Sequence, residues 1–542
     1  MNDMNNIAKN QNHINDINNK AKKYNHINDN NAGSTFTADI TCGIDFKANS
    51  DMNSPVYDVI IIGAGASGLF AAACIDLDSF TDNASGGPTR LAYQADSDDT
   101  THRAFKGLIL EKTSRPGTKL LMSGSGQCNI THSGSIKDFV KCYGNNGKKI
   151  RSCLYKYNNI SLMDFLHENG IETFIRDDGK VFPASMDAHD VLFMLLRHAK
   201  NNCFEIRYNS PVTEISHIGK DDIGNDSPGY KPEIKSSVIA NHITNASSSD
   251  VTSSTSEFAS SVNINYKADG IADNANCTFE NAMATPVENL WQIVSGDKTY
   301  LAHSVIIATG GCSYPTTGSD GSMFKTLSNN LDIDITKLKP ALSSIQLQDY
   351  PYSELSGISF KDIHTSIWHD DRKTAETVED LLFTHRDLSG PAIINISKFA
   401  ETNDKLRINY LYPMNYEQAL EKLKAAMHGT KGSPVNVIST AFDIPKRFCQ
   451  IIVEKSGTSL KSIASSLTGD EFVIASVSGF NKAMATSGGI DLKQINTSTF
   501  EFKAHPGLYA IGEALDIDGI TGGYNLQFAY SSAMAAVTAI AK

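Results

Sequence analysis

The sequence predicts an α/β fold, in which a mostly parallel sheet covered by helices is interrupted by an inserted domain. Two observations predict the sheet: apolar runs of strand length near both ends of the chain, and helix-forming segments that follow them. A third observation predicts the insertion, because residues 338–483 carry strand patterns first and helical patterns afterwards. A chain of 542 residues is also long enough for two or more domains.

Composition restricts the class of protein. An apolar content of 40% and a charged content of 20% are typical of soluble globular proteins, and a net charge of -12 argues against a general polyanion-binding protein. The 9 cysteines include no C-x-x-C pair, so neither a zinc site nor a disulfide framework is expected. No apolar run reaches membrane-spanning length, and the N-terminus lacks a signal-peptide core, which predicts a cytoplasmic protein without a membrane partner.

Three stretches are too polar to build a core. Residues 1–54 are rich in Asn, Asp, Lys and His and are expected to form a disordered tail. Residues 79–103 and 219–286 are dominated by small polar residues and are expected to be insertions. The sheet domain is then expected to comprise residues 55–337 and 484–542, on either side of the inserted domain at 338–483.

The segment Tyr57 to Ile75 predicts a nucleotide site. An apolar strand runs into Gly63, Gly65 and Gly68, which have the G-x-G-x-x-G spacing. The first glycine permits a tight turn, the second lets backbone N–H groups approach a pyrophosphate, and the third allows close packing of helix on strand. A diphosphate is therefore expected at the N-terminus of the following helix, where unpaired amides and the helix dipole favour an anion.

Glu111 ends the next apolar strand, at 107–111, and is the expected ligand of a ribose. It lies more than 40 residues after Gly68, a longer spacing than usual, which an insertion at 79–103 would explain. A carboxylate there repels a 2′-phosphate. The site therefore suits the adenosine of FAD or NAD and disfavours NADP.

Residues 112–133 form a second glycine-rich segment with basic side chains. Lys112, Arg115 and Lys119 are able to approach phosphates, and Gly124 and Asn129 lie where backbone donors and a sharp turn are expected. Cys128 lacks a neighbouring cysteine, so a packing role or a place in the cofactor wall is favoured over redox chemistry.

Local signals predict elements farther along the chain. Asp187 is expected to cap a helix over 188–202, and Asn415 with Gln418 is expected to cap one over 416–427. Strands are expected at 341–348, 358–369, 379–385 and 391–397. His385 ends one of these strands, and a structural role is favoured over contact with a substrate.

The C-terminal segment returns to the α/β pattern. A strand at 508–511 runs into Gly512 and Glu513, and Asn525 is expected to open a helix of small and apolar residues. In a flavin site this places Glu513 near the ribityl hydroxyls and directs the helix N-terminus at the pyrimidine edge, where it stabilises negative charge. The combination with the N-terminal glycine turn favours FAD over NAD.

Several motifs together resemble the bacterial FAD-dependent oxidoreductases grouped with bile-acid Δ4,6-reductase and aminoacetone-oxidase-like proteins. The matching segments are GAGASG (63–68), KLLMSGSGQCNIT (119–131), DGKVFP (178–183), ATGGCSYPTTGSDG (308–321), LLFTHRDLSGPAI (381–393) and GEALDIDGITGGYNLQ (512–527). The resemblance implies a discontinuous Rossmann-like FAD-binding domain with an inserted β-barrel and small helical domain. Local departures are Gln127, where the family pattern is close to SGGGRCN, the pair Arg386-Asp387, and a shortened TGSDG.

Together these features predict an enzyme that binds FAD and transfers a hydride between flavin N5 and a small organic substrate. NADH or NADPH is expected as a transient electron donor, which would make the protein a reductase; the alternatives are an O₂-using oxidase of a small amine, a flavin-dependent nucleic-acid modifier, or a non-catalytic flavin-binding protein. No nucleic-acid partner is expected. No catalytic residue is assigned, and the expected cofactor-binding residues are Gly63, Gly65, Ala66, Ser67, Gly68, Glu111, Lys112, Lys119, Gly124, Asn129, Val212, Thr309, Gly310, Gly512, Glu513, Asn525, Leu526 and Gln527.

Overall fold

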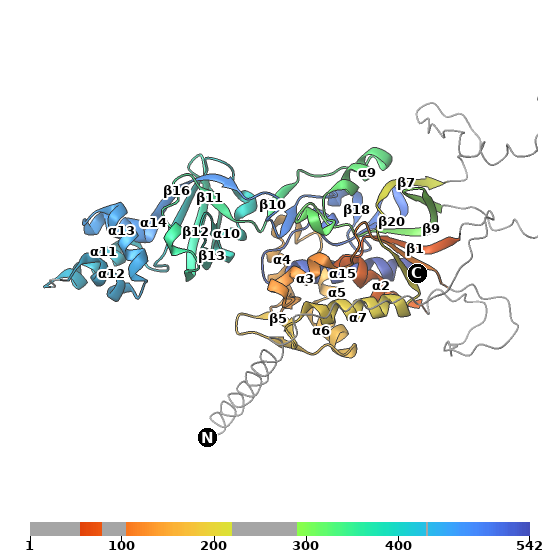
Figure 1. Cartoon of the computed structure of the whole chain (residues 1–542), viewed down its shortest axis with the longest axis horizontal. Coiled ribbons are helices and arrows are strands. Elements are labelled where there is room, and N and C mark those ends of the chain that lie inside the picture. The colour runs from red at the N-terminus through yellow and green to blue at the C-terminus, as the bar shows by residue number, and fades with distance from the viewer. Residues whose placement is uncertain (1–54, 78–104, 219–289, 430–431) are drawn as a thin grey trace, which may run out of the picture. The chain divides into compact units, whose positions relative to one another are not determined.

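The computed structural model describes residues 55–77, 105–218, 290–429 and 432–542 (Figure 1). The expectations for residues 1–54, 79–103 and 219–286 therefore concern segments that lie outside the described residues. Among the described residues, no helix combines the length and the apolar character that crossing a bilayer requires.

A 9-stranded sheet forms the centre of the nucleotide-type domain. Its order is β18 (Ile495–Asn496), β19 (Glu501–Phe502), β20 (His505–Ala510), β9 (Lys298–Ile307), β1 (Val56–Ile62), β2 (Gly107–Leu110) and β6 (Phe204–Arg207), with β7 (Val212–Ile218) and β8 (Leu290–Ser295) attached through β9. Strands β20, β9, β1, β2 and β6 are parallel, with Ile61 opposite both Ile109 and Ile306. The residues of β1 from Val59 to Ile62 are buried, as a strand covered on both faces requires.

Helices cover this sheet. The small-residue helices α2 (Ala66–Cys74) and α15 (Tyr524–Ile540) pack against each other, and α2 also packs on α7 (Ala188–Asn201), so that the three lie side by side in Figure 1. Helices α3 (Thr118–Met122), α4 (Ile136–Cys142), α5 (Arg151–Lys156), α6 (Asn159–Glu168) and α9 (Ser322–Leu331) complete the domain, with a small sheet of β3 (Thr131–His132), β5 (Lys180–Pro183) and β4 (Thr173–Ile175). Asp187 caps α7 as predicted, its side chain accepting from His189 N–H.

A closed six-membered barrel lies between Ile345 and Val477 in the sequence. Its strand order is β11 (Ile345–Leu347), β14 (Leu388–Ser389), β13 (Arg372–Phe383), β12 (Ser359–His369), β15 (Lys405–Asn409) and β16 (Asp470–Val477). Helices α11 (Tyr416–Met427), α12 (Pro434–Phe442), α13 (Lys446–Ser456) and α14 (Leu460–Gly469) join its last two strands. Barrel and helices share a core separate from that of the sheet domain, with Tyr352, Phe383 and Phe448 among its members.

Two predicted elements need correction. The strand expected at 391–397 is instead the short helix α10 (Pro391–Ile394) followed by a 3-10 turn (Ser397–Phe399). Pro391 occupies the first turn, where its missing N–H costs nothing, and Gly390 has φ 83°. The C-terminal helix begins at Tyr524 rather than Asn525, because Gly523, with φ 92°, is its N-cap. The predicted fold class, a discontinuous Rossmann-like domain with an inserted barrel and helices, is confirmed.

The chain crosses between the two domains at β10 (Lys339–Ala341) and β17 (Ala485–Ser487), which pair as antiparallel strands. Ala341, Leu342 and Ala485 form a small core of their own at this crossing. The crossing lies beside the cavity described next, because Leu342 and Ala485 line it.

Candidate cofactor and substrate cavity

A cavity of about 810 Å³ lies where the parallel strands end. Gly63 follows β1, Glu111 follows β2, Thr309 follows β9 and Glu513 follows β20, and all of them line it. Ligands of open α/β sheets bind at the carboxyl ends of the strands, and the volume is within the range of cofactor and substrate pockets. The topology therefore brings residues from distant parts of the sequence to one site.

The glycine turn forms one wall of this cavity. Gly63 has φ 107°, and a Cβ added there would lie 2.7 Å from the Ala308 carbonyl oxygen, so only glycine fits. Gly65 is the N-cap of α2, which has no side-chain cap and no acidic residue in its first turn. A Cβ at Gly65 would meet protein only at 4.0 Å. The first amides of α2 are thus available to an anion that approaches the backbone closely.

Glu111 is held in a defined orientation although it is almost buried. Its Oε2 accepts from Ala64 N–H at 2.7 Å, and its Oε1 accepts from the N–H and the hydroxyl of Thr113 at 2.8 and 2.7 Å. These bonds fix the carboxylate between the glycine turn and the loop after β2, at the cavity surface. Val212 lines the same end, two residues after Ser210, whose N–H donates to the Glu111 carbonyl.

Glu513 is the centre of a polar network on the opposite wall. Its Oε2 pairs with Lys119 Nζ at 2.6 Å, and its Oε1 accepts from the Ser313 hydroxyl at 2.7 Å and from Thr486 N–H at 2.8 Å. Lys119 also hydrogen-bonds Ser313. The carboxylate charge is thereby neutralised by the lysine, and both side chains are fixed where they face the cavity.

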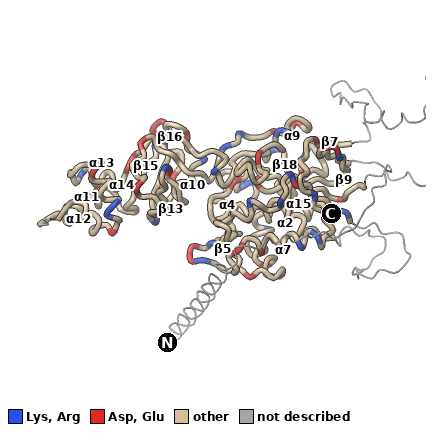
Figure 2. The backbone as a smooth tube through the Cα atoms, viewed as in Figure 1, with Lys and Arg blue, Asp and Glu red and all other residues tan. Residues whose placement is uncertain are grey.

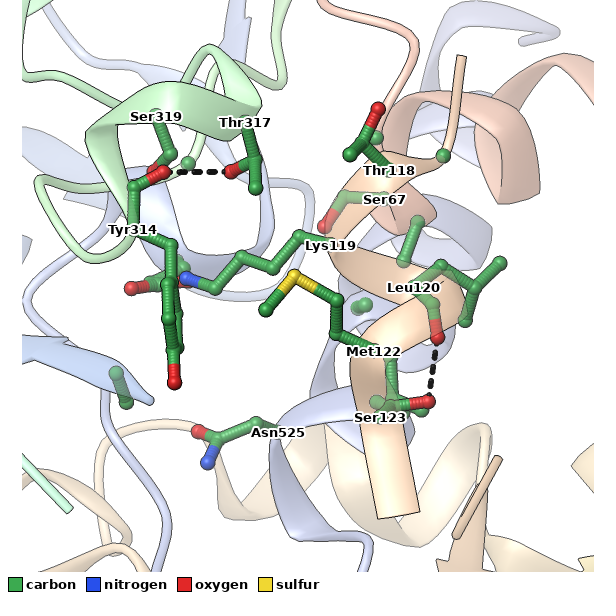
Figure 3. A pocket seen from close by; sticks show the side chains of 18 of the residues that line it. Ser67, Thr118, Lys119, Leu120, Met122, Ser123, Tyr314, Thr317, Ser319 and Asn525 are labelled. Atoms are coloured by element: carbon green, nitrogen blue, oxygen red, sulfur yellow. Dashed lines mark hydrogen bonds and ion pairs between the residues drawn. The ribbon is translucent and has the colours of Figure 1, made fainter. Parts of the chain in front are cut away.

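The N-terminus of α15 closes another side. Gly523 caps the helix without a side-chain bond. In the amide orientation that satisfies its neighbours, Asn129 donates to the carbonyls of Thr131 and Val181 and accepts from Gly523 N–H at 3.3 Å. The Asn525 side chain bonds both backbone groups of Gly519, at 2.8 and 3.0 Å, and faces the cavity (Figure 3).

Two buried hydroxyl groups on the cavity wall have no hydrogen-bond partner, namely Thr309 Oγ1 and Ser319 Oγ. A buried polar atom without a partner costs free energy, so these atoms fit a polar ligand in the cavity. Gly310, with φ 71°, leaves room beside Ser319, since a Cβ there would lie 2.8 Å from Ser319 Oγ. The donor set, the open glycine cradle and the orphaned hydroxyls together fit a dinucleotide.

Three of the expected cofactor residues lie behind the wall rather than on it. Gly68 allows α2 to approach the turn, because a Cβ there would lie 2.0 Å from the Gly63 carbonyl oxygen. Gly512 makes room for Ser67 in the same way, and Gln527 is fully buried and bonds Thr131, Tyr157 and Ser531. The others line the cavity: Gly63, Gly65, Ala66, Ser67, Glu111, Lys112, Lys119, Gly124, Asn129, Val212, Thr309, Gly310, Glu513, Asn525 and Leu526.

Basic and thiol side chains differ in their placement. Arg115 lines the cavity, and Lys112, which also lines it, forms an ion pair with Asp320 at 2.5 Å.

Burial raises the pKa of the Cys128 thiol to about 11, so it stays protonated near neutral pH, as a packing role requires. His385 is exposed and is not among the lining residues. No group of three or more potential metal ligands occurs in the described part of the chain.

Several lining residues were not predicted. Tyr314 and Met122 reach into the cavity from opposite walls (Figure 3), and Arg176 and Phe182 line it from the β4–β5 hairpin. Leu342, Pro391 and Met484 reach it from the barrel and its crossing. Tyr314 and Phe182 lie inside motifs of the resemblance, but nothing in their spacing says which way their side chains point.

Comparison with known proteins agrees with the fold. The model of a family described as "HI0933-like protein Rossmann domain" matches residues 91–265 and 251–539. The chain is 25% identical over 490 residues to the ribosomal RNA dihydrouridine synthase of Escherichia coli, covering 88% of this chain and 96% of that protein. It is 23% identical over 501 residues to the 3-dehydro-bile acid delta(4,6)-reductase of Clostridium scindens, covering 89% and 98%. A solved quinol fumarate reductase from E. coli shares 12% identity at a TM-score of 0.40, covering 90% of this chain and 70% of that one.

Proposed function

Because the chain belongs to the HI0933-like family and is an FAD-dependent oxidoreductase, we propose that it reduces a carbon–carbon double bond conjugated to a carbonyl group, with NADH or NADPH as electron donor. Its relatives support this reaction class. Dihydrouridine is uridine with the ring double bond saturated, and the bile-acid relative is named for reduction at positions 4 and 6. In both cases the reacting double bond is conjugated to a carbonyl group.

We assign the cofactor to the residues that line the cavity. The first amides of α2 would bind the pyrophosphate, and Glu111 would accept from the ribose hydroxyls. Glu513 and Lys119 would face the ribityl chain, and the N-terminus of α15 would lie at the pyrimidine edge, where its dipole favours negative charge. FAD bound in this way supplies the hydride-transfer chemistry.

The observation that carries the proposal is the composition of the cavity wall beyond the glycine turn. Beyond the glycine turn the cavity extends to the domain crossing, where Leu342, Pro391 and Met484 line it together with Tyr314. Leu342, Pro391 and Met484 come from the barrel domain and its connections, and their apolar side chains can exclude water from an organic substrate. Tyr314, which follows β9 in the sheet domain, adds a phenol that offers a proton.

Tyr314 is the residue we propose as proton donor. Saturating a conjugated double bond needs a hydride at one carbon and a proton at the carbon next to the carbonyl group. Tyr314 has φ 51°, and its backbone is held by bonds of 2.9 Å to Phe480 and 2.8 Å from Thr317. Within the described residues its hydroxyl has no hydrogen-bond partner. It would give its proton to substrate and regain one from water.

Stopped-flow spectroscopy without oxygen tests the electron donor. Mixing the holoenzyme with NADH or NADPH is expected to bleach the flavin absorbance, and adding an unsaturated ketone or a uridine-containing RNA is expected to restore it. No bleaching with either nicotinamide would show that the protein is not a reductase of this kind. Bleaching by a small amine instead of a nicotinamide, followed by recovery on adding O₂, would support the amine oxidase.

The substrate itself has two candidates. Figure 2 shows basic and acidic residues interspersed along the described backbone, and the net charge is -12, which favours a small organic substrate over a long polyanion. The names of the E. coli and Haemophilus influenzae relatives favour a uracil base in ribosomal RNA. Mass spectrometry after turnover decides between them, because the reduced compound gains two hydrogens.

A further inference from the structure

Gln127 lies on the cavity wall in the glycine-rich segment SGSGQCN, where it carries no charge. The Gln127 side-chain oxygen accepts a hydrogen bond of 2.7 Å from Nη2 of Arg176, which belongs to another segment of the chain. Both residues line the cavity. A positive charge therefore stands beside position 127 although the sequence lacks one there.

The Arg176 guanidinium is held in a fixed position. It lies 3.9 Å from the centroid of the Phe182 ring, a cation–π contact. The backbone of Arg176 is part of the tight β4–β5 turn, since its N–H donates to the Lys180 carbonyl and its carbonyl accepts from Gly179 N–H, both at 2.9 Å. Arg176 is half-buried. A group held on three sides in this way loses little freedom when it binds a ligand.

Arg176 also differs from most cations of the cavity in having no ion pair. Among the described residues the lining lysines are paired, with N–O distances of 2.5 to 2.7 Å: Lys112 with Asp320, Lys119 with Glu513, and Lys180 with Asp178. Asp178, two residues after Arg176, is paired with Lys180 instead. Burial raises the pKa of Asp178, but hydrogen bonds from Lys180 and the charges of Lys180 and Arg176 lower it overall.

The location of Arg176 separates it from the adenosine end of the cavity. A Cβ on Gly124 would lie 3.3 Å from the Phe182 ring and 2.7 Å from Asn129 N. Asn129 in turn bonds Gly523 N–H, at the start of α15. The stack of Arg176 on Phe182 is thus linked to the end of the cavity where α15 begins. Arg115 is the other lining cation without an ion pair in the described chain, and it follows Glu111 and Thr113 in the sequence.

We propose that Arg176, oriented by Gln127 and Phe182, binds an anionic oxygen group of the substrate and thereby selects substrates that carry a phosphate or carboxylate. This inference rests on the proposed function for the reaction, but its test needs no turnover. A guanidinium suits these groups because it can donate two parallel hydrogen bonds to them. The phosphate would come from a nucleotide unit of RNA, and the carboxylate from a steroid acid.

Binding to the oxidised holoenzyme tests the subsite directly. The probes are two matched pairs, UMP with uridine, and an unsaturated steroid keto acid with its methyl ester, titrated by isothermal calorimetry and by the change in flavin absorbance. In one pair the anion is expected to bind about tenfold more tightly than its neutral partner. The pair that shows this preference identifies the source of the anionic group. Arg176→Gln should reduce the preference to near unity.

Three variants control the measurement. Gln127→Arg combined with Arg176→Gln moves the charge from position 176 to position 127 and should restore most of the preference. Arg176→Lys keeps the charge without the planar fork and should give an intermediate value. Arg197→Gln removes an exposed arginine that bonds only the Asn169 carbonyl among the described residues, and should change nothing. Melting temperature and flavin content establish that each variant is folded and loaded.

Two results would overturn the inference. One is a wild-type holoenzyme that binds anion and neutral compound equally in both pairs. The other is an Arg176→Gln variant that keeps the preference but changes the flavin midpoint potential or the rate of reduction by NADPH, which would assign the arginine to the cofactor or the nicotinamide. Failure of the proposed reaction would appear separately, as no bleaching by nicotinamide in the wild-type protein.

Discussion

Gly63 and Gly65 belong to one turn but are needed for different reasons. Gly63 has a left-handed φ of 107° and its hydrogen faces the Ala308 carbonyl, so a side chain there strains the protein itself. Gly65 has φ -79°, which any residue adopts, and open space around its Cα. The second glycine is therefore explained by something that approaches the backbone from the cavity.

Substitution of the two glycines should separate folding from cofactor binding. Gly65→Ala is expected to change the free energy of unfolding of the apoprotein by less than about 1 kcal/mol and to weaken FAD binding more than tenfold, because the methyl group occupies the approach of the pyrophosphate. Gly63→Ala should cost about 3 kcal/mol in the apoprotein. Denaturant unfolding and flavin fluorescence measure the two effects. Equal loss of stability in both variants would contradict the assignment.

Tyr314→Phe should affect one half of the catalytic cycle. The substitution removes the proposed proton and keeps the ring, so reduction of the flavin by NAD(P)H should keep its rate while reoxidation by the unsaturated substrate slows about 100-fold or more. Single-turnover stopped flow measures the two steps separately. Tyr155→Phe, at a side chain 47% exposed and outside the cavity lining, is the matched control. Equal slowing of both steps would instead indicate a role in positioning the cofactor.

At the residue scale, sequence patterns predicted one side of the cavity better than the other. Glycine spacing and a strand-end acid have a fixed geometric meaning, so residues such as Gly65 and Glu111 could be predicted locally. Tyr314, Arg176 and Leu342 could not, because they meet only after β9, the β4–β5 hairpin and the domain crossing have folded together. The Arg176–Gln127 bond joins residues 49 positions apart, and no sequence spacing indicates it.

At the element scale, three helices that begin at the cavity differ in their N-termini from three that begin elsewhere. Helices α2, α9 and α15, whose first turns line the cavity, begin after glycines and have no side-chain cap. Helices α6, α7 and α11, whose first residues do not line it, are capped by Asn158, Asp187 and Asn415. A capping side chain would occupy the amides that an anionic ligand needs, so α2 and α15 can offer theirs to a ligand. The Asp320 carboxylate already accepts from Ser322 N–H of α9, and α5 and α13 are uncapped although they do not line the cavity.

The capping box of α11 gives a prediction confined to one element. Asn415 accepts from Gln418 N–H, and the Gln418 side chain accepts from Asn415 N–H, both at 3.0 Å. Asn415→Ala should lower the local stability of α11 by about 1 kcal/mol and leave the flavin content unchanged. Hydrogen exchange of the amides in Tyr416–Met427 measures the local effect. Loss of flavin in this variant would mean that the helices of the inserted domain are coupled to the cofactor site.

Both caps at Asp187 and Asn415 could be predicted because capping depends on neighbouring residues only. The strand prediction for 391–397 was wrong because the conformation there depends on contact with a distant segment. Its apolar residues suit a strand locally, but Gly390 approaches the backbone of β13 so closely that a Cβ would lie 2.6 Å from the Asp380 carbonyl oxygen, and a helix turn follows. Strand order in the barrel likewise depends on pairings between distant segments, such as β11 with β16.

At the scale of the whole molecule, the inserted domain holds part of the cavity wall in place. The loop that precedes α15 contains Asp518 and Thr521, and both are bound by residues near α10. Lys398 Nζ pairs with Asp518 Oδ2 at 2.6 Å, and the Asn395 side-chain oxygen accepts from Thr521 N–H at 2.9 Å. Thr521 and its neighbours line the cavity. The barrel domain therefore shapes the cavity in two ways: some of its residues line the wall, and others hold the loop before α15 that also lines it.

Lys398→Ala should weaken this tie in a pH-dependent way. Burial raises the pKa of Asp518, and Lys398 partly opposes that rise, so the folded state holds the proton more tightly than the unfolded state. The contribution of Asp518 to stability is thus complete below its unfolded pKa and is lost as the pH rises through its folded pKa. Without Lys398 the loss of folding stability near neutral pH should grow to about 3 kcal/mol, because a buried carboxylate is left unpaired. This loss should shrink as the pH falls and Asp518 takes up a proton. Thermal unfolding of wild type and variant across pH 4 to 8, with flavin release as a second signal, measures this difference. Adding Asp518→Asn to Lys398→Ala should remove the pH dependence, and a defect that persists unchanged in the double variant would show that Lys398 acts through other contacts.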